Sequence, residues 1–129
     1  MLTVDIERLA PDGDGVVVVD GRAIHVRGAV PGDTAVIRIQ SLKRTSARAE
    51  VVSMDSTSVP RAVAPCPHFG VCGGCRWQDI PYIGQCMLKN GLIRDILGTV
   101  PGMEPPEDVP FVQSPDTFNY RNKMEYSFD

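Results

Sequence analysis

Three cysteines close together in the chain are the residues best suited to do chemistry. Cys66, Cys72 and Cys75 fall within the ten-residue run C-P-H-F-G-V-C-G-G-C. Thiolates at this spacing can converge on one metal centre, and the glycines permit positive φ angles and close approach of backbone N–H groups to cluster sulfurs. Iron–sulfur clusters usually take four thiolates. The spacing therefore suggests an iron–sulfur cluster with one ligand still to be found.

Zinc is the alternative metal, because its tetrahedral sites accept mixtures of cysteine and histidine. His68 could complete such a site, but it follows Cys66 by only two residues, unlike the usual paired zinc spacing, so we interpret it as a packing residue or a neighbour of the ligands. Cys86 shares one side of an expected helix with Ile93 and Leu97, which favours a small buried hydrophobe over a ligand. Iron–sulfur and zinc both remain open on these residues alone.

The residues before the cysteines are predicted to form a small β-barrel. Short apolar or alternating runs are separated by glycine, proline and aspartate turns, and Asp20-Gly21 predicts a hairpin. We expect five short antiparallel strands around an apolar interior, which implies a mainly β fold with an OB-like barrel. The runs are Val4 and Ile6, residues 16–19, Ile24 and Val26, the trio Ala35, Ile37 and Ile39, and residues 48–52.

The chain divides into four predicted parts. Residues 1–55 form the barrel, 56–65 a linker with two prolines, 66–100 the cysteine-rich segment and a helix ending near Gly98, and 101–129 a proline-rich connector and a first strand. Residues 123–128 alternate in period two and then stop without a turn or partner. We therefore expect a truncated chain that ends at the start of an incomplete α/β domain.

Composition places the chain among soluble globular proteins. It has 129 residues, a net charge of -3 and 43% hydrophobic residues, with no apolar run near the ~18 residues of a membrane span. The first ten residues lack the basic start and apolar core of a secretory signal. We expect a cytoplasmic, reducing location without a membrane partner, where cysteines are metal ligands or free thiols.

Positive charge is concentrated in residues 21–49, which contain six lysine or arginine residues and one acidic residue, Asp33. Strand alternation predicts that Arg27, Arg38 and Arg48 project outward, and Lys43-Arg44 falls at a loop tip. These five side chains are predicted to pair with RNA phosphates, which gives affinity without much sequence discrimination. Trp77 and Phe69 are expected to pack beside the cysteines rather than to stack on bases.

The combination of motifs resembles the TRAM-containing RNA 5-methyluridine methyltransferases, which methylate C5 of uridine in ribosomal or transfer RNA with S-adenosylmethionine. The likeness covers nearly the whole chain, and the spacing C-x5-C-G-G-C-x-x-Q after a barrel is its most specific part. The matching residues are 11–15, 30–33, 66–78, Gln85, Lys89 and 120–123.

This resemblance implies an OB-like TRAM barrel that grips RNA and a [4Fe-4S] cluster held by Cys66, Cys72 and Cys75. The family's fourth ligand lies downstream of the 120–123 motif, beyond residue 129. The methyltransferase domain, with its S-adenosylmethionine site and catalytic residues, is expected in the missing part of the same polypeptide, so this chain should be inert by itself. The alternative is a non-catalytic, zinc-stabilised RNA-binding module. Radical methylthiotransferases also carry TRAM barrels, but their cluster motif generally precedes the barrel.

Overall fold

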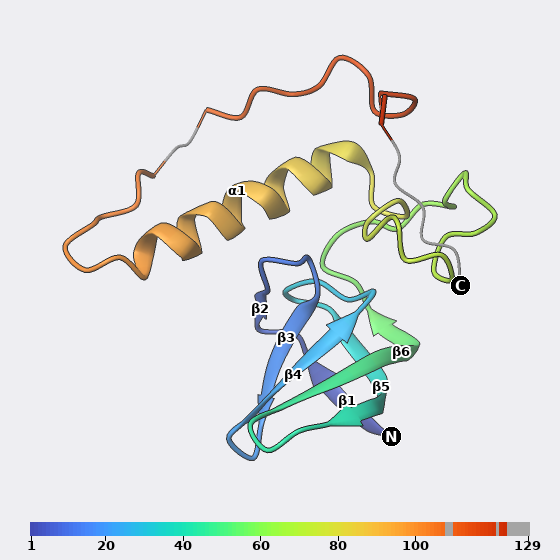
Figure 1. Cartoon of the computed structure of the whole chain (residues 1–129), viewed down its shortest axis with the longest axis vertical. Helices are drawn as coiled ribbons and strands as arrows, with labels where there is room; N and C mark the ends of the chain where they lie inside the picture. The colour runs from blue at the N-terminus through green and yellow to red at the C-terminus, as the bar shows by residue number, and fades with distance from the viewer. Residues whose placement is uncertain (108–109, 121, 124–129) are drawn as a thin grey trace.

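Six strands and one helix make up the described part of the chain, residues 1–107, 110–120 and 122–123 of this computed structural model (Figure 1). The elements in order are β1 (Leu2–Asp5), β2 (Arg8–Leu9), β3 (Gly15–Val19), β4 (Arg22–Arg27), β5 (Thr34–Leu42), β6 (Ser46–Ser56) and α1 (Tyr82–Gly98). The mainly β fold class is confirmed. α1 ends at Gly98, as predicted, and begins at Tyr82.

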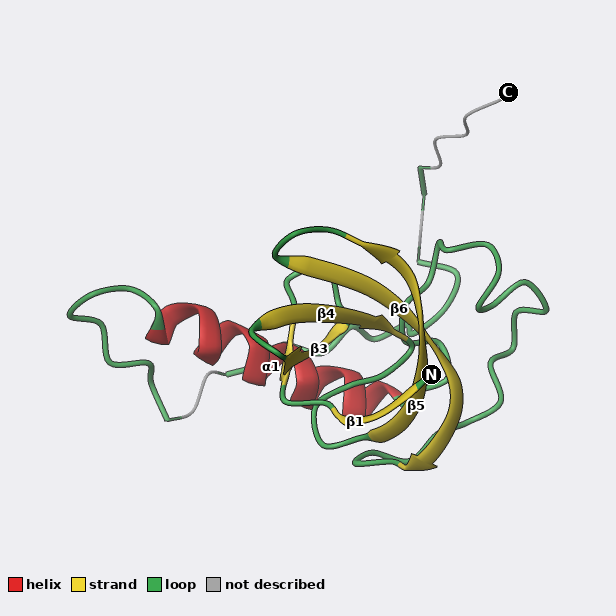
Figure 2. Ribbon diagram, turned by 90° about the horizontal axis from the view of Figure 1, so that it is seen from below, coloured by secondary structure: helices red, strands yellow, loops and turns green. Residues whose placement is uncertain are grey.

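The six strands form one sheet in the order β1-β5-β6-β4-β3-β2, which curls into a small barrel (Figure 2). The expectation of five antiparallel strands was wrong in two respects. β2 is a sixth, two-residue strand, and β4 pairs with β6 in parallel. β4 does not pair with its successor β5. Instead, β6 lies between them in the sheet, antiparallel to β5 and parallel to β4.

The hairpin between β3 and β4 turns at Asp20-Gly21, as the sequence predicts. Val19 is aligned with Arg22, and the two turn residues have φ angles of 50° and 72°. Two consecutive positive φ angles define the primed turn whose twist matches that of the flanking strands. This local signal therefore sets the register of β3 against β4.

The barrel core consists of inward-facing aliphatic side chains from five strands and from the loops after β1 and β4. Its buried members are Val4, Ile6, Val17, Ile24, Val26, Ala29, Ala35, Ile37, Ala47 and Ala49. The prediction that Ile39 points inward was wrong, since it is 36% exposed. All of β5 from Arg38 onward is exposed, because this half of the β5–β6 hairpin extends past the core, with a register shift after Ile39.

A second apolar cluster joins the barrel to α1. Leu9, Val30 and Ile80 are buried together, and Trp77, Leu88 and Leu92 pack against them. Burial of Cys86 is confirmed at 5% exposure, but Ile93, placed on the same face by the sequence, is 41% exposed. Apolar residues occur all around this helix, so the periodicity could not identify the side that packs. No helix in the described residues is long and apolar enough to cross a membrane.

Residues 101–107 and 110–120 contain no strand or helix and return along α1 (Figure 1). Pro105 lies beside Gly98 at the end of the helix, and the Ser114 N–H donates to the Tyr82 hydroxyl at its start, 2.7 Å away. The strand predicted at 123–128 lies almost wholly outside the described residues. The predicted domain boundaries stay predictions.

Candidate nucleic-acid interface and cysteine turn

The cysteine turn, residues 66–75, is a loop whose shape depends on its own backbone. The Phe69 N–H donates to the Cys66 carbonyl at 3.1 Å, and the Cys72 N–H donates to the His68 carbonyl at 3.0 Å. Gly70 and Gly73 have φ angles of 86° and 77°, which side-chain-bearing residues rarely adopt. The three cysteines are free thiols, and Cys72 and Cys75 are exposed. The turn thus presents sulfur donors at the surface.

Gln78 connects two of the predicted metal ligands. Its side-chain oxygen Oε1 accepts a hydrogen bond from the Cys66 N–H at 2.8 Å, and its side-chain nitrogen Nε2 lies 3.6 Å from the Cys75 sulfur. A Cβ added at Gly74 would lie 3.4 Å from the Cys72 sulfur, so the glycine leaves space beside that thiol. The sequence motif includes this glutamine, but its spacing did not reveal that the side chain joins the two ends of the turn.

The thiol groups are not gathered into a metal site in this structure. In the part of the chain that is described, no three side chains of His, Cys, Asp or Glu lie close enough together to hold an ion. The donor chemistry does fit a cluster: three soft thiolates on a short, glycine-containing turn, with an amide donor directed at one sulfur. Assignment of Cys66, Cys72 and Cys75 as metal ligands therefore stays a prediction.

A partly buried ion pair fixes the end of the cysteine turn to the barrel. Arg76 Nη1 lies 2.6 Å from Asp14 Oδ1, and Asp14 is only 4% exposed. Burial raises the pKa of Asp14, while Arg76 opposes this rise by favouring the charged form. Next to it, Trp77 Nε1 donates to the Gly13 carbonyl at 3.0 Å. Trp77 is thus a packing residue, but it packs against the barrel and not beside the cysteines as expected.

The predicted linker is also attached to the barrel. Asp33, which is fully buried, accepts hydrogen bonds from the backbone and hydroxyl of Ser58, at 2.8 and 3.1 Å, and from Arg61. Arg61 also lies 3.8 Å from Asp79, just before α1. Burial raises the pKa of Asp79, and Arg61 opposes this rise. Asp33 is the single acidic residue of the cationic segment 21–49. Its carboxylate thus holds the linker on the barrel and does not face the solvent.

The side chain of Arg27, at the end of β4, reaches from the barrel to the cysteine turn. Its guanidinium Nη2 is 3.1 Å from the position that a Cβ on Gly73 would occupy, and both Arg27 and Arg48 favour the charged form of Asp14. Arg27 is exposed, as strand alternation predicts. The turn beside it is a neighbour that the sequence pattern did not indicate.

Arg38 and Arg48 occupy the outer face of the sheet together with Arg27. Glu50 of β6 is aligned with Arg27 on one side and with Arg38 on the other. It forms a 3.6 Å ion pair with Arg38 and accepts a hydrogen bond from Gln40 at 2.6 Å. The cationic face therefore includes an acid that lies one residue beyond the charge-rich segment of the sequence.

Lys43 and Arg44 form the exposed tip of the β5–β6 hairpin, as predicted. The Lys43 N–H donates to the Ser46 carbonyl at 2.8 Å, which closes the hairpin. Neither side chain has an ion pair within the described ranges. The five predicted RNA-binding cations thus fall into two groups: three on the sheet face and two at the projecting tip.

Residues 1–52 match the family model of the TRAM domain. We call this matched region the TRAM barrel. This match ends within β6, before the linker and the cysteine turn.

Curated relatives extend the similarity through the cysteine turn. An uncharacterized RNA methyltransferase of Nitratidesulfovibrio vulgaris is 36% identical over 98% of this chain and 27% of that protein. The 23S rRNA (uracil(1939)-C(5))-methyltransferase RlmD of Acidithiobacillus ferrooxidans is 35% identical over 96% of this chain and 27% of that protein. The chain therefore spans about a quarter of the length of these relatives.

A solved structure is similar to this chain in sequence. The tRNA (uracil-54, C5)-methyltransferase of Pyrococcus abyssi, in complex with S-adenosyl-L-homocysteine, is 27% identical and covers 75% of this chain and 21% of that chain, with a TM-score of 0.47. A TM-score at this level does not establish a common arrangement of the parts.

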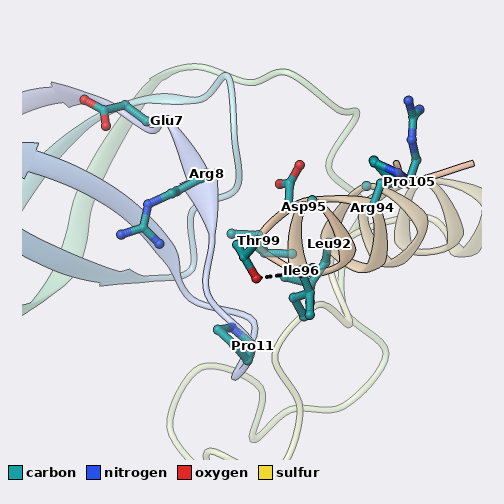
Figure 3. A pocket seen from close by; sticks show the side chains of 12 residues that line it. Glu7, Arg8, Pro11, Leu92, Arg94, Asp95, Ile96, Thr99 and Pro105 are labelled. Carbon is teal, nitrogen blue, oxygen red and sulfur yellow. Dashed lines mark hydrogen bonds between the residues drawn. The ribbon is translucent and has the colours of Figure 1, made fainter. Parts of the chain in front are cut away.

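A cavity of about 1040 Å3 separates the TRAM barrel from the second half of α1 (Figure 3). Glu7, Arg8 and Pro11 line it from the barrel side, and Leu92 and Asp95 line it from the helix. Its charged residues carry both signs, and it contains none of the predicted metal or RNA ligands. The cavity is thus separate from both predicted sites.

Proposed function

We propose that this chain is the N-terminal RNA-binding and iron–sulfur portion of an S-adenosylmethionine-dependent RNA (uracil-C5-)-methyltransferase. The observation that supports this most strongly is the extent of the similarity to RlmD. It covers 96% of the chain, so the similarity includes both the TRAM barrel and the cysteine turn, and RlmD is named for uracil-C5 methylation.

In this proposal the barrel binds the RNA backbone. Lys43 and Arg44 project from the hairpin tip, where an ammonium and a guanidinium group can reach successive phosphates and release their counterions. Arg48 and Arg27 extend this positive surface toward the cysteine turn. Arg38 contributes less, because its guanidinium is already paired with Glu50.

The cysteine turn would hold a [4Fe-4S] cluster through Cys66, Cys72 and Cys75, with a fourth ligand beyond residue 129. When bound, the cluster would act as a structural anchor for the turn. The chain's own residues orient that turn: Gln78 bridges Cys66 and Cys75, and Arg76 ties it to the barrel through Asp14. No residue of this chain is assigned to methyl transfer, and the S-adenosylmethionine site belongs to the rest of the protein.

The substrate would be ribosomal or transfer RNA in a reducing cytoplasm. The direct test uses the protein encoded by the whole reading frame that contains this chain. It is incubated with unmodified ribosomal and transfer RNA and S-adenosylmethionine, and the nucleosides are analysed by mass spectrometry. The expected product is 5-methyluridine. Formation of a different methylated nucleoside, or of none, would refute the proposed activity.

A further inference from the structure

A second cavity, of about 600 Å3, lies beside the cysteine turn and is separate from the cationic face of the barrel. Its walls come from the linker before the turn, the end of the turn with the predicted metal ligand Cys75, the N-terminal half of α1 and residues 117–120. Residues 110–120 are held over this part of the helix, since the Ser114 N–H donates to the Tyr82 hydroxyl at 2.7 Å. Tyr82 itself lines the cavity. Segments far apart in the sequence thus enclose it.

Two exposed aromatic side chains form part of this wall. Phe118 is 48% and Tyr120 66% exposed, so both rings are accessible to a ligand. Asn119 between them has a φ angle of 60°, in the left-handed region that asparagine adopts more often than most other non-glycine residues. All three residues line the same wall of the cavity.

We propose that this cavity binds one unstacked base of single-stranded RNA, an inference that rests on the proposed function of the chain. Aromatic rings stack on any base through its π face, and an amide can hydrogen-bond to a base edge. Phe118 and Tyr120 supply the rings, and Asn119 supplies an amide on the same wall. Lys89 supplies a cation for the adjoining phosphate and has no ion pair in the described residues.

Three other polar or aromatic side chains of the wall are already engaged: Arg76, Trp77 and Gln85. Trp77 donates to the Gly13 carbonyl and packs in the cluster below α1. Arg76 is paired with Asp14, and the Gln85 amide donates to the carbonyls of Trp77 and Ile80. Base stacking therefore falls to Phe118 and Tyr120 rather than to the tryptophan. A polypeptide segment is the competing occupant, but it would leave the cation and the amide without a specific role.

The first test measures the affinity of the 129-residue chain for a fluorescent oligouridylate at low salt. Tyr120→Ala should weaken binding by about tenfold, since stacking on one aromatic ring contributes a factor of this order or more. Tyr120→Phe should bind like the unaltered chain because it keeps the ring. Phe111→Ala is the matched control, from an aromatic in the same segment that does not line the cavity.

The second test locates the base by photocrosslinking with 5-iodouridine in the same oligonucleotide. We expect crosslinks at Phe118 or Tyr120, mapped by mass spectrometry. If Lys43→Glu with Arg44→Glu weakens RNA binding while Tyr120→Ala does not, and crosslinks stay on the barrel, the base pocket is refuted and the proposed function stands. If the chain binds no RNA at low salt, the proposed function fails and the pocket's occupant is not a base.

Discussion

Arg76 donates a 2.6 Å hydrogen bond to Asp14, which joins the residue that follows the cysteine turn to a carboxylate buried at the start of β3. The two residues are 62 positions apart in the sequence. Together with the hydrogen bond from Trp77 to Gly13, this contact sets the orientation of the turn relative to the TRAM barrel. The predicted metal ligands and the predicted RNA-binding surface are thus held as one unit.

Removal of the Arg76 guanidinium should destabilise the fold. Arg76→Ala leaves the Asp14 carboxylate buried without its partner, and we expect the free energy of unfolding to fall by about 1–3 kcal/mol, as for a hydrogen bond to a charged group. The side chain of Arg76 is 35% exposed, which keeps the loss below that of a fully buried pair. Urea unfolding measures the change, with Arg94→Ala, at an exposed position of α1, as the control. Equal midpoints for the two variants would contradict the role of this contact.

Stability should decrease as the pH rises through the raised pKa of Asp14. Because burial raises this pKa above its value of 3.8 in the unfolded chain, the folded state binds the proton more tightly, and ionisation of Asp14 costs stability above that pH. Asp79 acts in the same direction. Asp14→Asn keeps an acceptor for Arg76 and removes the ionisation. The unfolding free energy of wild type relative to Asp14→Asn should therefore fall as the pH rises from 3.8 through the raised pKa of Asp14. A rise over this range would show the opposite linkage.

Substitutions at two glycines of the cysteine turn can distinguish the cost of backbone strain from the cost of contact with Arg27. A methyl group at Gly70 meets open space, so Gly70→Ala should cost about 1–2 kcal/mol from the positive φ alone. At Gly73 the same strain is joined by an approach of 3.1 Å to the Arg27 guanidinium. We expect Gly73→Ala to be only slightly more destabilising in urea unfolding, because the exposed Arg27 guanidinium is the far end of a flexible side chain and can move aside. In a double-mutant cycle, Arg27→Ala should reduce that excess. No coupling would mean that the guanidinium does not pack on the turn.

Metal content should depend on three of the four cysteines. In the protein from the whole reading frame, purified without oxygen, we expect iron and sulfide, with the iron content lowered by Cys66→Ser, Cys72→Ser or Cys75→Ser. Cys86→Ser is the matched control, since that thiol is buried on α1, away from the exposed end of the turn. Zinc without sulfide in the unaltered protein would support the non-catalytic zinc module instead.

The sequence revealed what depends on near neighbours. Asp20-Gly21 forms the predicted hairpin because both residues accept positive φ angles, and Lys43-Arg44 lies at a tip because strands on both sides alternate. The contacts that position the cysteine turn could not be predicted in this way. Asp14 and Asp33 resembled ordinary turn residues, and only the folded chain brings Arg76 and Arg61 to them.

The helix illustrates a second limit. Its apolar residues do not form one stripe, so the pattern grouped Cys86 with Ile93, whereas the barrel contacts Leu88 and Leu92. Likewise, the pairing of Glu50 with Arg38 follows from the register of β5 against β6, which sequence spacing did not specify. The register of the strands thus determines which cationic side chains on the sheet face remain available to bind phosphates.

The central claim is that the TRAM barrel of this chain binds RNA through cations at its hairpin tip. The most direct measurement is the dissociation constant for a single-stranded RNA as a function of salt concentration, for the unaltered chain and for Lys43→Glu with Arg44→Glu. We predict weaker binding by the variant at low salt and a salt dependence reduced by about one unit of slope for each phosphate that the variant no longer neutralises. Identical affinities and slopes for the two proteins would contradict the claim.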